Sequence, residues 1–183
     1  MYSHRSLALH SLAISLPDVL NLSQNDTVLP VVPMFHANAW GIPFACTMLG
    51  IKQVLPGPYL DPASILELLS AERVTFSAGV PTVWMGLLRE LDANPKAWKI
   101  VPGLRTLVGG AAVPEAMIRG FDKHGIHVRQ GWGMTETSPL GTVGFLKSHM
   151  LDWSEDDKYS VHAKQGLAVP FVEIRTINSE GVC

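Results

Sequence analysis

Short apolar runs alternate with longer helical stretches along most of this chain, and this alternation limits the possible folds more than any other feature. Its clearest unit begins at Asp61, a helix-capping residue, followed by Pro62 at the first helical position. The apolar run 74–78 is typical of a buried strand, and Pro81 then opens the next helix. Because parallel strands need a crossover between them, this order favours an α/β fold whose parallel sheet is flanked by helices on both faces.

The same pattern predicts further elements on either side of this unit. The expected strands are 27–32, 52–55, 74–78, 104–108 and 126–129. The expected helices run from a cap at Ser3 to about Leu20, from Asn38 to Leu49 with a bend near Gly41 and Pro43, from Pro62 through Leu69, from Pro81 through Leu91, and from Pro114 to His124. A length of 183 residues is enough for one domain with a hydrophobic core.

The alternation stops after Gly133. Residues 138–165 are expected to be rich in loops, with a solvated acidic patch at residues 155–157. Residues 171–177 alternate in the manner of a strand that starts a different subdomain. We therefore divide the chain into an α/β subdomain, residues 1–137, and a loop-rich segment with the start of a small β subdomain, residues 138–183.

Composition excludes several classes of protein. A net charge of −2 and a pI near 6.4 argue against nucleic acid or an anionic membrane as a partner. The two cysteines, Cys46 and Cys183, provide neither a disulfide framework nor a metal-binding spacing, which favours a reducing cytoplasm. Polar residues at His10, Ser11 and Ser15 interrupt the first apolar stretch, so it is expected to be an amphipathic helix and not a signal peptide. No segment has the length and apolarity of a transmembrane helix.

Two glycine-containing segments, 108–114 and 130–136, each follow an expected strand. Open α/β sheets bind ligands at the carboxyl ends of their strands, and glycine lets the backbone approach a ring or a phosphate closely. The second segment adds Thr135 and Glu136, which suit a phosphate contact and a magnesium ligand. A single glycine turn of this kind is more often structural, but two of them in this order and about twenty residues apart are a much more specific signal.

These motifs resemble those of a known family. Residues 130–136 are similar to the Tyr-Gly-x-Thr-Glu motif of the adenylate-forming enzymes, which include acyl-CoA synthetases, luciferases and peptide-synthetase adenylation domains. Residues 33–41 resemble the aromatic-His motif of that family, in a form most similar to medium- and long-chain fatty-acyl-CoA synthetases. Because segments 54–58, 78–82 and 166–177 also match, the resemblance covers essentially the whole chain and places it in the large domain of such an enzyme.

The resemblance implies a reaction in two halves. A fatty acid or another small carboxylic acid attacks the α-phosphate of ATP to give an acyl-adenylate and pyrophosphate, and coenzyme A then displaces AMP. ATP and Mg²⁺ are the implied cofactors, with coenzyme A as co-substrate. Such chemistry depends on positioning and charge neutralisation more than on a strong base.

The resemblance also implies a role for each residue of the site. Glu136 is expected to bind magnesium, Thr135 to contact phosphate, and His36 to lie near the acyl carboxylate. Trp40 and Met134 are expected on the acyl side, with Trp40 at the mouth of the fatty-acid tunnel. The cofactor-binding set, most of which flanks the adenine, is Gly109, Gly110, Ala111, Gln130, Gly131, Trp132 and Gly133.

Several of these residues have a structural alternative. Trp132 stands where the family usually has tyrosine, which keeps a ring for stacking but loses a hydroxyl. Glu136 also suits a turn cap, and both His36 and Trp40 are compatible with packing in a core. The remaining histidines show no spacing that suggests a metal and are assigned to structural or surface positions: His4, His10, His124, His127, His149 and His162.

Two hypotheses from other classes stand beside a fatty-acyl-CoA synthetase fragment. One is a non-catalytic module that binds a nucleotide or an acyl group, and the other is an interaction protein, since large domains of this family often form homodimers. An aryl- or other carboxylate-CoA ligase fragment is the catalytic alternative, against which Asn38-Ala39-Trp40 argues. Light scattering distinguishes a defined dimer from aggregation.

Parts of the family pattern are expected to lie outside this chain. The phosphate-binding loop of the family ends in a lysine just before the residues that 1–5 resemble, and the ribose-binding Thr-Gly-Asp motif comes after the part that this chain matches. The catalytic lysine belongs to a further, small mobile domain. We therefore expect no sustained acyl-CoA synthesis by this chain alone, because charge on the phosphates in the transition state is not neutralised. Sustained turnover in an acyl-adenylate assay would contradict this expectation.

Overall fold

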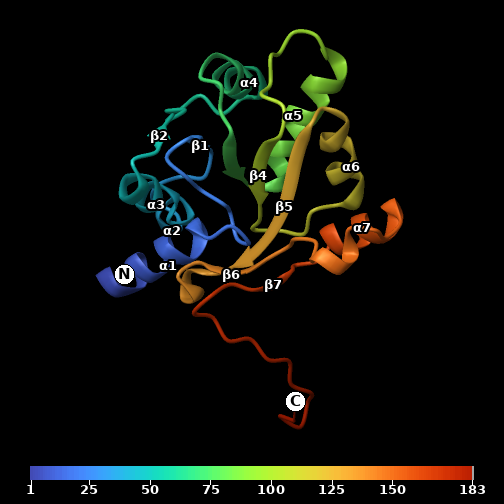
Figure 1. Cartoon of the computed structure of the whole chain (residues 1–183). Helices are drawn as coiled ribbons and strands as arrows, with labels where there is room; N and C mark the ends of the chain where they lie inside the picture. The colour runs from blue at the N-terminus through green and yellow to red at the C-terminus, as the bar shows by residue number, and fades with distance from the viewer. Residues whose placement is uncertain (183) are drawn as a thin grey trace.

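The computed structural model describes residues 1–182 and contains one seven-stranded sheet with helices on both faces (Figure 1). The strands are β1 (Thr27–Pro30), β2 (Lys52–Gln53), β3 (Phe76–Gly79), β4 (Leu104–Val108), β5 (Ile126–Gly133), β6 (Leu140–Val143) and β7 (Leu167–Ala168). Their order in the sheet is β2-β1-β3-β4-β5-β6-β7. The pairs among β1 to β5 are parallel, and β6 and β7 join in antiparallel fashion, which confirms the predicted α/β class.

Most helices connect successive strands, as the alternation predicts. The α-helices are α1 (His4–Ser15), α2 (Ala37–Trp40), α3 (Ile42–Leu49), α4 (Pro62–Ala71), α5 (Pro81–Ala93), α6 (Glu115–Lys123) and α7 (Glu155–His162). Two short 3₁₀ helices, η1 (Thr135–Thr137) and η2 (Ser148–Met150), follow β5 and β6. The predicted cap of α4 is confirmed, since the Asp61 carboxylate accepts a hydrogen bond from the Ser64 N–H at 3.0 Å.

The sheet separates two hydrophobic clusters, one on each face. Val28 and Leu29, which are neighbours in β1, are both fully buried but belong to opposite clusters. The larger cluster includes residues of α4, α5 and α6, with Trp84 and Phe121 in edge-to-face contact at 5.7 Å between ring centroids. The other cluster includes residues of α1 and α3. Burial on both faces explains why the strands appear in the sequence as continuous apolar runs.

Two elements differ in length from their predicted bounds for identifiable reasons. Helix α1 ends at Ser15, well before Leu20, because Pro17 disfavours the helical conformation for Leu16, which is extended. Strand β5 continues beyond Arg129 because it changes partner. Its parallel pairing with β4 ends at Gln130, and antiparallel pairing with β6 then extends the strand.

Two predictions about the last part of the chain are wrong. The acidic residues 155–157 do not lie in a loop but form the first turn of α7, where Ser154 caps the helix and negative charge is favoured by the helix dipole. Residues 171–177 contain no strand, since they pair with no neighbour, and the pairing of β7 covers only Leu167 and Ala168.

The sheet extends across the predicted subdomain division. β6 and β7 follow residue 137 and continue the sheet begun by β1 to β5, and the chain after β7 then runs away from it (Figure 1). Because one sheet contains strands from both sides of residue 137, the strands do not mark a boundary there, and the division into residues 1–137 and 138–183 stays a prediction. Within residues 1–182, no helix combines the length and apolarity needed to cross a membrane.

A partly buried ion pair holds the connection between α1 and β1 against the sheet. The Arg105 guanidinium in β4 donates to the carbonyl oxygens of Leu20 and Asn21, each at 2.7 Å, and forms a salt bridge with Asp26. The Asp26 carboxylate also accepts hydrogen bonds from the Thr75 hydroxyl at 2.6 Å and the Ser23 N–H at 2.9 Å. These contacts fix the path of the chain that leads to the fully buried Leu20.

The protonation of Asp26 is shifted by the same neighbours. Burial alone would raise the pKa of Asp26, but the hydrogen bonds from Thr75 and Ser23 and the charge of Arg105 lower it below its ordinary value. A carboxyl whose pKa is lowered in the folded state stabilises that state above its unfolded pKa. This stabilisation is lost as the pH falls through the lower, folded pKa.

We expect Asp26→Asn to lower the free energy of unfolding by about 3 kcal/mol at neutral pH, because it leaves Arg105 without its counter-ion. The difference between wild type and variant should shrink as the pH falls from about 4, the ordinary pKa of an aspartate in the unfolded chain, towards the lower pKa of folded Asp26. Urea unfolding at a series of pH values measures both effects.

Glu72→Gln is the matched control. Glu72 pairs with Lys52 at 2.6 Å, but both side chains are largely exposed, so the change should alter stability by less than about 1 kcal/mol. Equal losses in the two variants would show that the burial of the Asp26 pair contributes nothing.

Candidate active site

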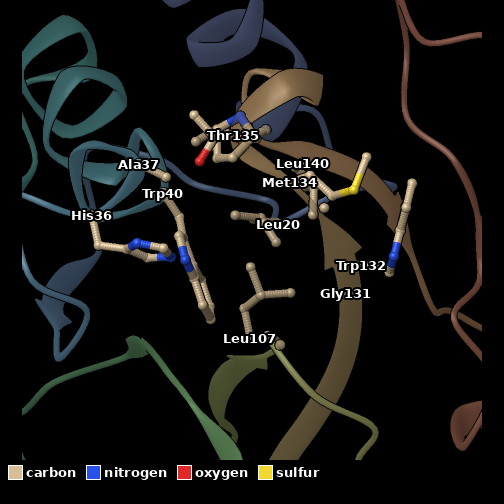
Figure 2. A pocket seen from close by; sticks show the side chains of 15 residues that line it. Leu20, His36, Ala37, Trp40, Leu107, Gly131, Trp132, Met134, Thr135 and Leu140 are labelled. Atoms are coloured by element: carbon tan, nitrogen blue, oxygen red, sulfur yellow. The ribbon is translucent and has the colours of Figure 1, made fainter. Parts of the chain in front are cut away.

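A cavity of about 230 Å³ lies at the carboxyl ends of β4 and β5 (Figure 2). Its walls combine glycine backbone, aromatic rings and aliphatic side chains. The lining residues are Ile14, Leu20, His36, Ala37, Trp40, Leu107, Gly109, Gly110, Gly131, Trp132, Gly133, Met134, Thr135, Pro139 and Leu140. Figure 2 shows His36 and Trp40 together on one side of this cavity, with Trp132 on the opposite side.

Most of the predicted site residues meet in this one cavity. Those that line it are His36, Trp40, Gly109, Gly110, Gly131, Trp132, Gly133, Met134 and Thr135. Ala111, Gln130 and Glu136 do not line it. The aromatic-His motif and the two glycine motifs, far apart in the sequence, are therefore brought together by the parallel order of the strands, as the position of both glycine motifs at strand ends predicts.

Glycine is needed where β4 and β5 end because the two backbones approach closely there. A Cβ atom added to Gly109 would lie 2.8 Å from the Gly131 carbonyl oxygen, and one added to Gly131 would lie 2.9 Å from the Leu107 side chain. Gly110 has a φ of +84°, which side chains rarely tolerate. The wall of the cavity at this edge is therefore glycine backbone, which lets a ligand approach more closely than a side chain would.

The segment that carries His36 and Trp40 has an unusual backbone. The predicted bend before α3 is present, but the four residues of α2 all have positive φ, between +46° and +55°, and form a left-handed turn. Such a conformation costs about 1–2 kcal/mol for each residue with a side chain. The turn is held by hydrogen bonds from the Ala39 N–H to the Pro33 and His36 carbonyl oxygens, at 3.2 and 3.1 Å, and by complete burial of Ala39.

Gln130 belongs to the second glycine motif, but its side chain makes a hydrogen bond within the protein and does not line the cavity. Its side-chain amide group is buried, and the side-chain oxygen Oε1 accepts a hydrogen bond from the Val113 N–H at 3.1 Å. This bond ties the loop that contains Gly109, Gly110 and Ala111 to β5. The structure therefore favours an indirect part for Gln130, the support of the loop beside the cavity.

The Trp132 side chain packs on Gly141 of the neighbouring strand. A Cβ atom added to Gly141 in β6 would be 2.6 Å from the indole, so this glycine makes room for the ring. The Trp132 side chain keeps 37% of its surface exposed, which leaves a ring face open to a ligand. This arrangement is compatible with stacking, the role implied by the motif.

Thr135 and Glu136 lie in η1, directly after β5, but face different spaces. Thr135 lines the main cavity, whereas Glu136 lines a neighbouring cavity of about 210 Å³ together with Thr137 and Ser138. Glu136 is exposed, and within residues 1–182 no group of three or more His, Cys, Asp or Glu residues could hold a metal ion. One carboxylate beside a hydroxyl suits Mg²⁺ only when substrate phosphates and water supply the other oxygen ligands.

The aliphatic wall of the cavity was not predicted from the sequence. Ile14, Leu20, Leu107 and Leu140 line it and are buried. The alternation of β4 and the apolar face of α1 could have indicated Leu107 and Ile14. No local signal indicates Leu20, because its place depends on hydrogen bonds from Arg105, which is distant in the sequence.

Comparison with known proteins identifies the family. The whole chain, residues 1–183, matches the family model described as AMP-binding enzyme, and the chain therefore belongs to that family. Over 181 residues it is 52% identical to the long-chain-fatty-acid–CoA ligase of Thermus thermophilus, covering 99% of this chain and 33% of that protein. Over 183 residues it is 48% identical to the medium-chain-fatty-acid–CoA ligase of Ectopseudomonas oleovorans, covering 100% of this chain and 33% of that protein.

A solved structure agrees with the fold. The crystal structure of a long-chain-fatty-acid-CoA ligase from Archaeoglobus fulgidus matches with a TM-score of 0.82 and 23% identity, over 100% of this chain and 36% of that one. At this level of identity the match shows the fold. The chain spans about a third of the length of the curated relatives that it matches.

We expect Gln130→Leu to lower the free energy of unfolding by about 1–3 kcal/mol, because it leaves the buried Val113 N–H without an acceptor. Hydrogen exchange should show that the Val113 amide loses protection. The control is Gln53→Leu, since the Gln53 amide makes only a long, exposed contact of 3.5 Å with Thr47. Unchanged protection of Val113 in the Gln130 variant would contradict the supporting role of this side chain.

Proposed function

We propose that this chain forms the acyl- and adenine-binding part of an AMP-forming fatty-acid–CoA ligase. The main support is that the aromatic-His motif and both glycine motifs line one cavity, which joins an aliphatic wall to an edge of glycine backbone. The names of the relatives with 52% and 48% identity agree with this substrate class. The fatty-acyl-CoA synthetase prediction from the sequence is thus the function that the geometry supports best.

The proposed reaction has two steps. In the first, a carboxylate oxygen of the fatty acid attacks the α-phosphate of ATP, a phosphorus–oxygen bond forms, and pyrophosphate leaves. In the second, the thiol sulfur of coenzyme A attacks the acyl carbonyl carbon, the thiol loses its proton, and AMP leaves. Both steps need the reacting groups to be held close and in line more than they need a strong base.

The acyl chain is proposed to lie along the aliphatic wall. Leu20, Leu107 and Leu140 are buried and line the cavity, and burial of each CH₂ group there would contribute about 0.8 kcal/mol. His36 is exposed at the cavity, where its imidazole suits a hydrogen bond to the carboxylate. Trp40 and Met134 complete the acyl side.

The nucleotide is proposed to lie against the glycine edge. Gly109, Gly110 and Gly131 would allow the adenine to approach the backbone, and Trp132 would stack on it. The Thr135 hydroxyl would donate a hydrogen bond to a phosphate oxygen. Glu136, beside it, would hold Mg²⁺, which neutralises phosphate charge when bound. Ala111 and Gly133 would contribute backbone on either side.

The proposed setting is the cytoplasm, with fatty acid as the organic substrate. Cys46 is a free, buried thiol, and burial raises its pKa to about 12, so it is an unreactive core residue. A homodimer stays a prediction, which light scattering tests.

Binding of a stable acyl-adenylate analogue tests the proposal. We expect isothermal titration of the chain with dodecanoyl-sulfamoyl-adenosine to show saturable binding, tighter than that of AMP because the acyl chain adds burial. Trp132→Ala should weaken binding by about tenfold or more, since a base stacked on an aromatic ring contributes about 1–3 kcal/mol. Trp153→Ala is the matched control, because Trp153 is similarly exposed, at 42%, but does not line the cavity.

Two outcomes would contradict the proposal. One is the absence of binding by a chain that unfolds cooperatively and is therefore folded. The other is an equal loss of affinity in the Trp132 and Trp153 variants, which would show that binding does not depend on the candidate site.

A further inference from the structure

His10 is a buried histidine that the proposed reaction does not use. It lies in α1, its exposed fraction is 7%, and neither ring nitrogen has a hydrogen-bond partner among the described residues 1–182. Burial lowers the pKa of His10 to about 4, so the imidazole is neutral at physiological pH. A buried polar ring without partners destabilises a fold, so another contact must account for its place here.

The contact in question is with Gly41, the residue that follows the left-handed turn 37–40. A Cβ atom added to Gly41 would lie 2.5 Å from Nδ1 and 2.7 Å from Cε1 of His10, so the ring packs directly on the glycine backbone. Gly41 itself has a φ of +70° and ends the turn by donating its N–H to the Asn38 carbonyl oxygen at 3.0 Å. The imidazole thus blocks movement of the backbone at the end of the strained turn.

His10 also lies close to the segment that follows Thr135. The residue lines the second cavity, whose wall includes Glu136, Thr137 and Ser138. His10 therefore lies between the turn that carries Trp40 and the segment that follows Thr135. A side chain in this place affects the shape of the main cavity without lining it.

We propose that His10 is a positioning residue: its ring holds Gly41 and thereby keeps the left-handed turn that presents His36 and Trp40 to the cavity. This inference deepens the proposed function, because it assigns a determinant of acyl binding outside the cavity wall. The ring acts through its shape, since its nitrogens make no hydrogen bond within residues 1–182. A flat apolar ring should therefore replace it, whereas a small side chain should not.

The first experiment measures the contact without any ligand. Urea unfolding is compared for Gly41→Ala, His10→Ala and the double variant, with Gly50→Ala as control. Gly50 lies at the other end of α3 with nearly the same φ, +69°, but a Cβ atom added there meets nothing within 4 Å. Gly50→Ala should therefore report backbone strain alone, about a tenfold loss in the folding equilibrium constant.

Gly41→Ala should lose about a further tenfold, because its methyl group also collides with the imidazole. In the His10→Ala background, the effect of Gly41→Ala should fall to that of Gly50→Ala or below it, because the collision is gone and relaxation of the turn can also release backbone strain at Gly41. An effect of Gly41→Ala that is the same in both backgrounds would overturn the proposal, since the two residues would then be energetically independent.

The second experiment follows the turn and the ligand. Backbone NMR chemical shifts of residues 37–40 should leave the left-handed range in His10→Ala but keep it in His10→Phe. Binding of dodecanoyl-sulfamoyl-adenosine should weaken about tenfold in His10→Ala and stay near wild type in His10→Phe, with AMP affinity unchanged in both. An unchanged turn in His10→Ala, or an equal loss of affinity in His10→Phe, would overturn the positioning role.

The two proposals fail separately. If the wild-type chain binds no analogue, the proposed function fails, but the unfolding cycle and the chemical shifts still decide whether His10 holds the turn. If the analogue binds and His10→Ala leaves both the turn and the affinity unchanged, only the role of His10 fails.

Discussion

The candidate site depends above all on the close approach of β4 and β5 where the two strands end. Their parallel pairing continues to Val108 and Gln130, so both glycine motifs begin at the same level of the sheet, the first as a loop after β4 and the second as the part of β5 that pairs with β6. A side chain at Gly109 would meet the Gly131 carbonyl oxygen at 2.8 Å and push the strands apart. Because glycine occupies these places, a ligand at this edge meets peptide groups instead of side chains, and the cavity keeps room for a flat ring.

The part of the aliphatic wall that contains Leu20 is positioned by two arginine side chains of the sheet. Arg105 and Arg129, in β4 and β5, donate hydrogen bonds to carbonyl oxygens of Leu20 and Val19 in the connection after α1. Burial lowers the pKa of Arg129, yet the arginine can stay charged because it starts from a high pKa. These two long side chains draw an irregular segment over the sheet, and Leu20 becomes part of the aliphatic wall as a result.

The sequence was informative where structure follows from local signals. Pro62 and Pro81, at the starts of helices, marked the alternation that predicts the parallel sheet, and glycine after two strands predicted a ligand edge. The sequence was less informative where contacts between distant residues determine the structure. The wrong strand at 171–177 had alternation but no neighbour to pair with, and the part of Leu20 depends on a bond to Arg105. The missed start of α7 had a local signal, the cap at Ser154.

The left-handed turn 37–40 is a part of the candidate site that local sequence signals do not predict. Asn38 tolerates positive φ, but Ala37, Ala39 and Trp40 do not favour it, so local preference opposes the observed backbone. At about 1–2 kcal/mol per residue, the turn uses a substantial share of a typical net stability of about 5–15 kcal/mol. Packing must therefore offset this cost, through the burial of Ala39 and the ring of His10 on Gly41. Because these contacts belong to the core and not to a ligand, the backbone that carries His36 and Trp40 is fixed without a ligand, which under the proposed function would lower the entropy cost of binding.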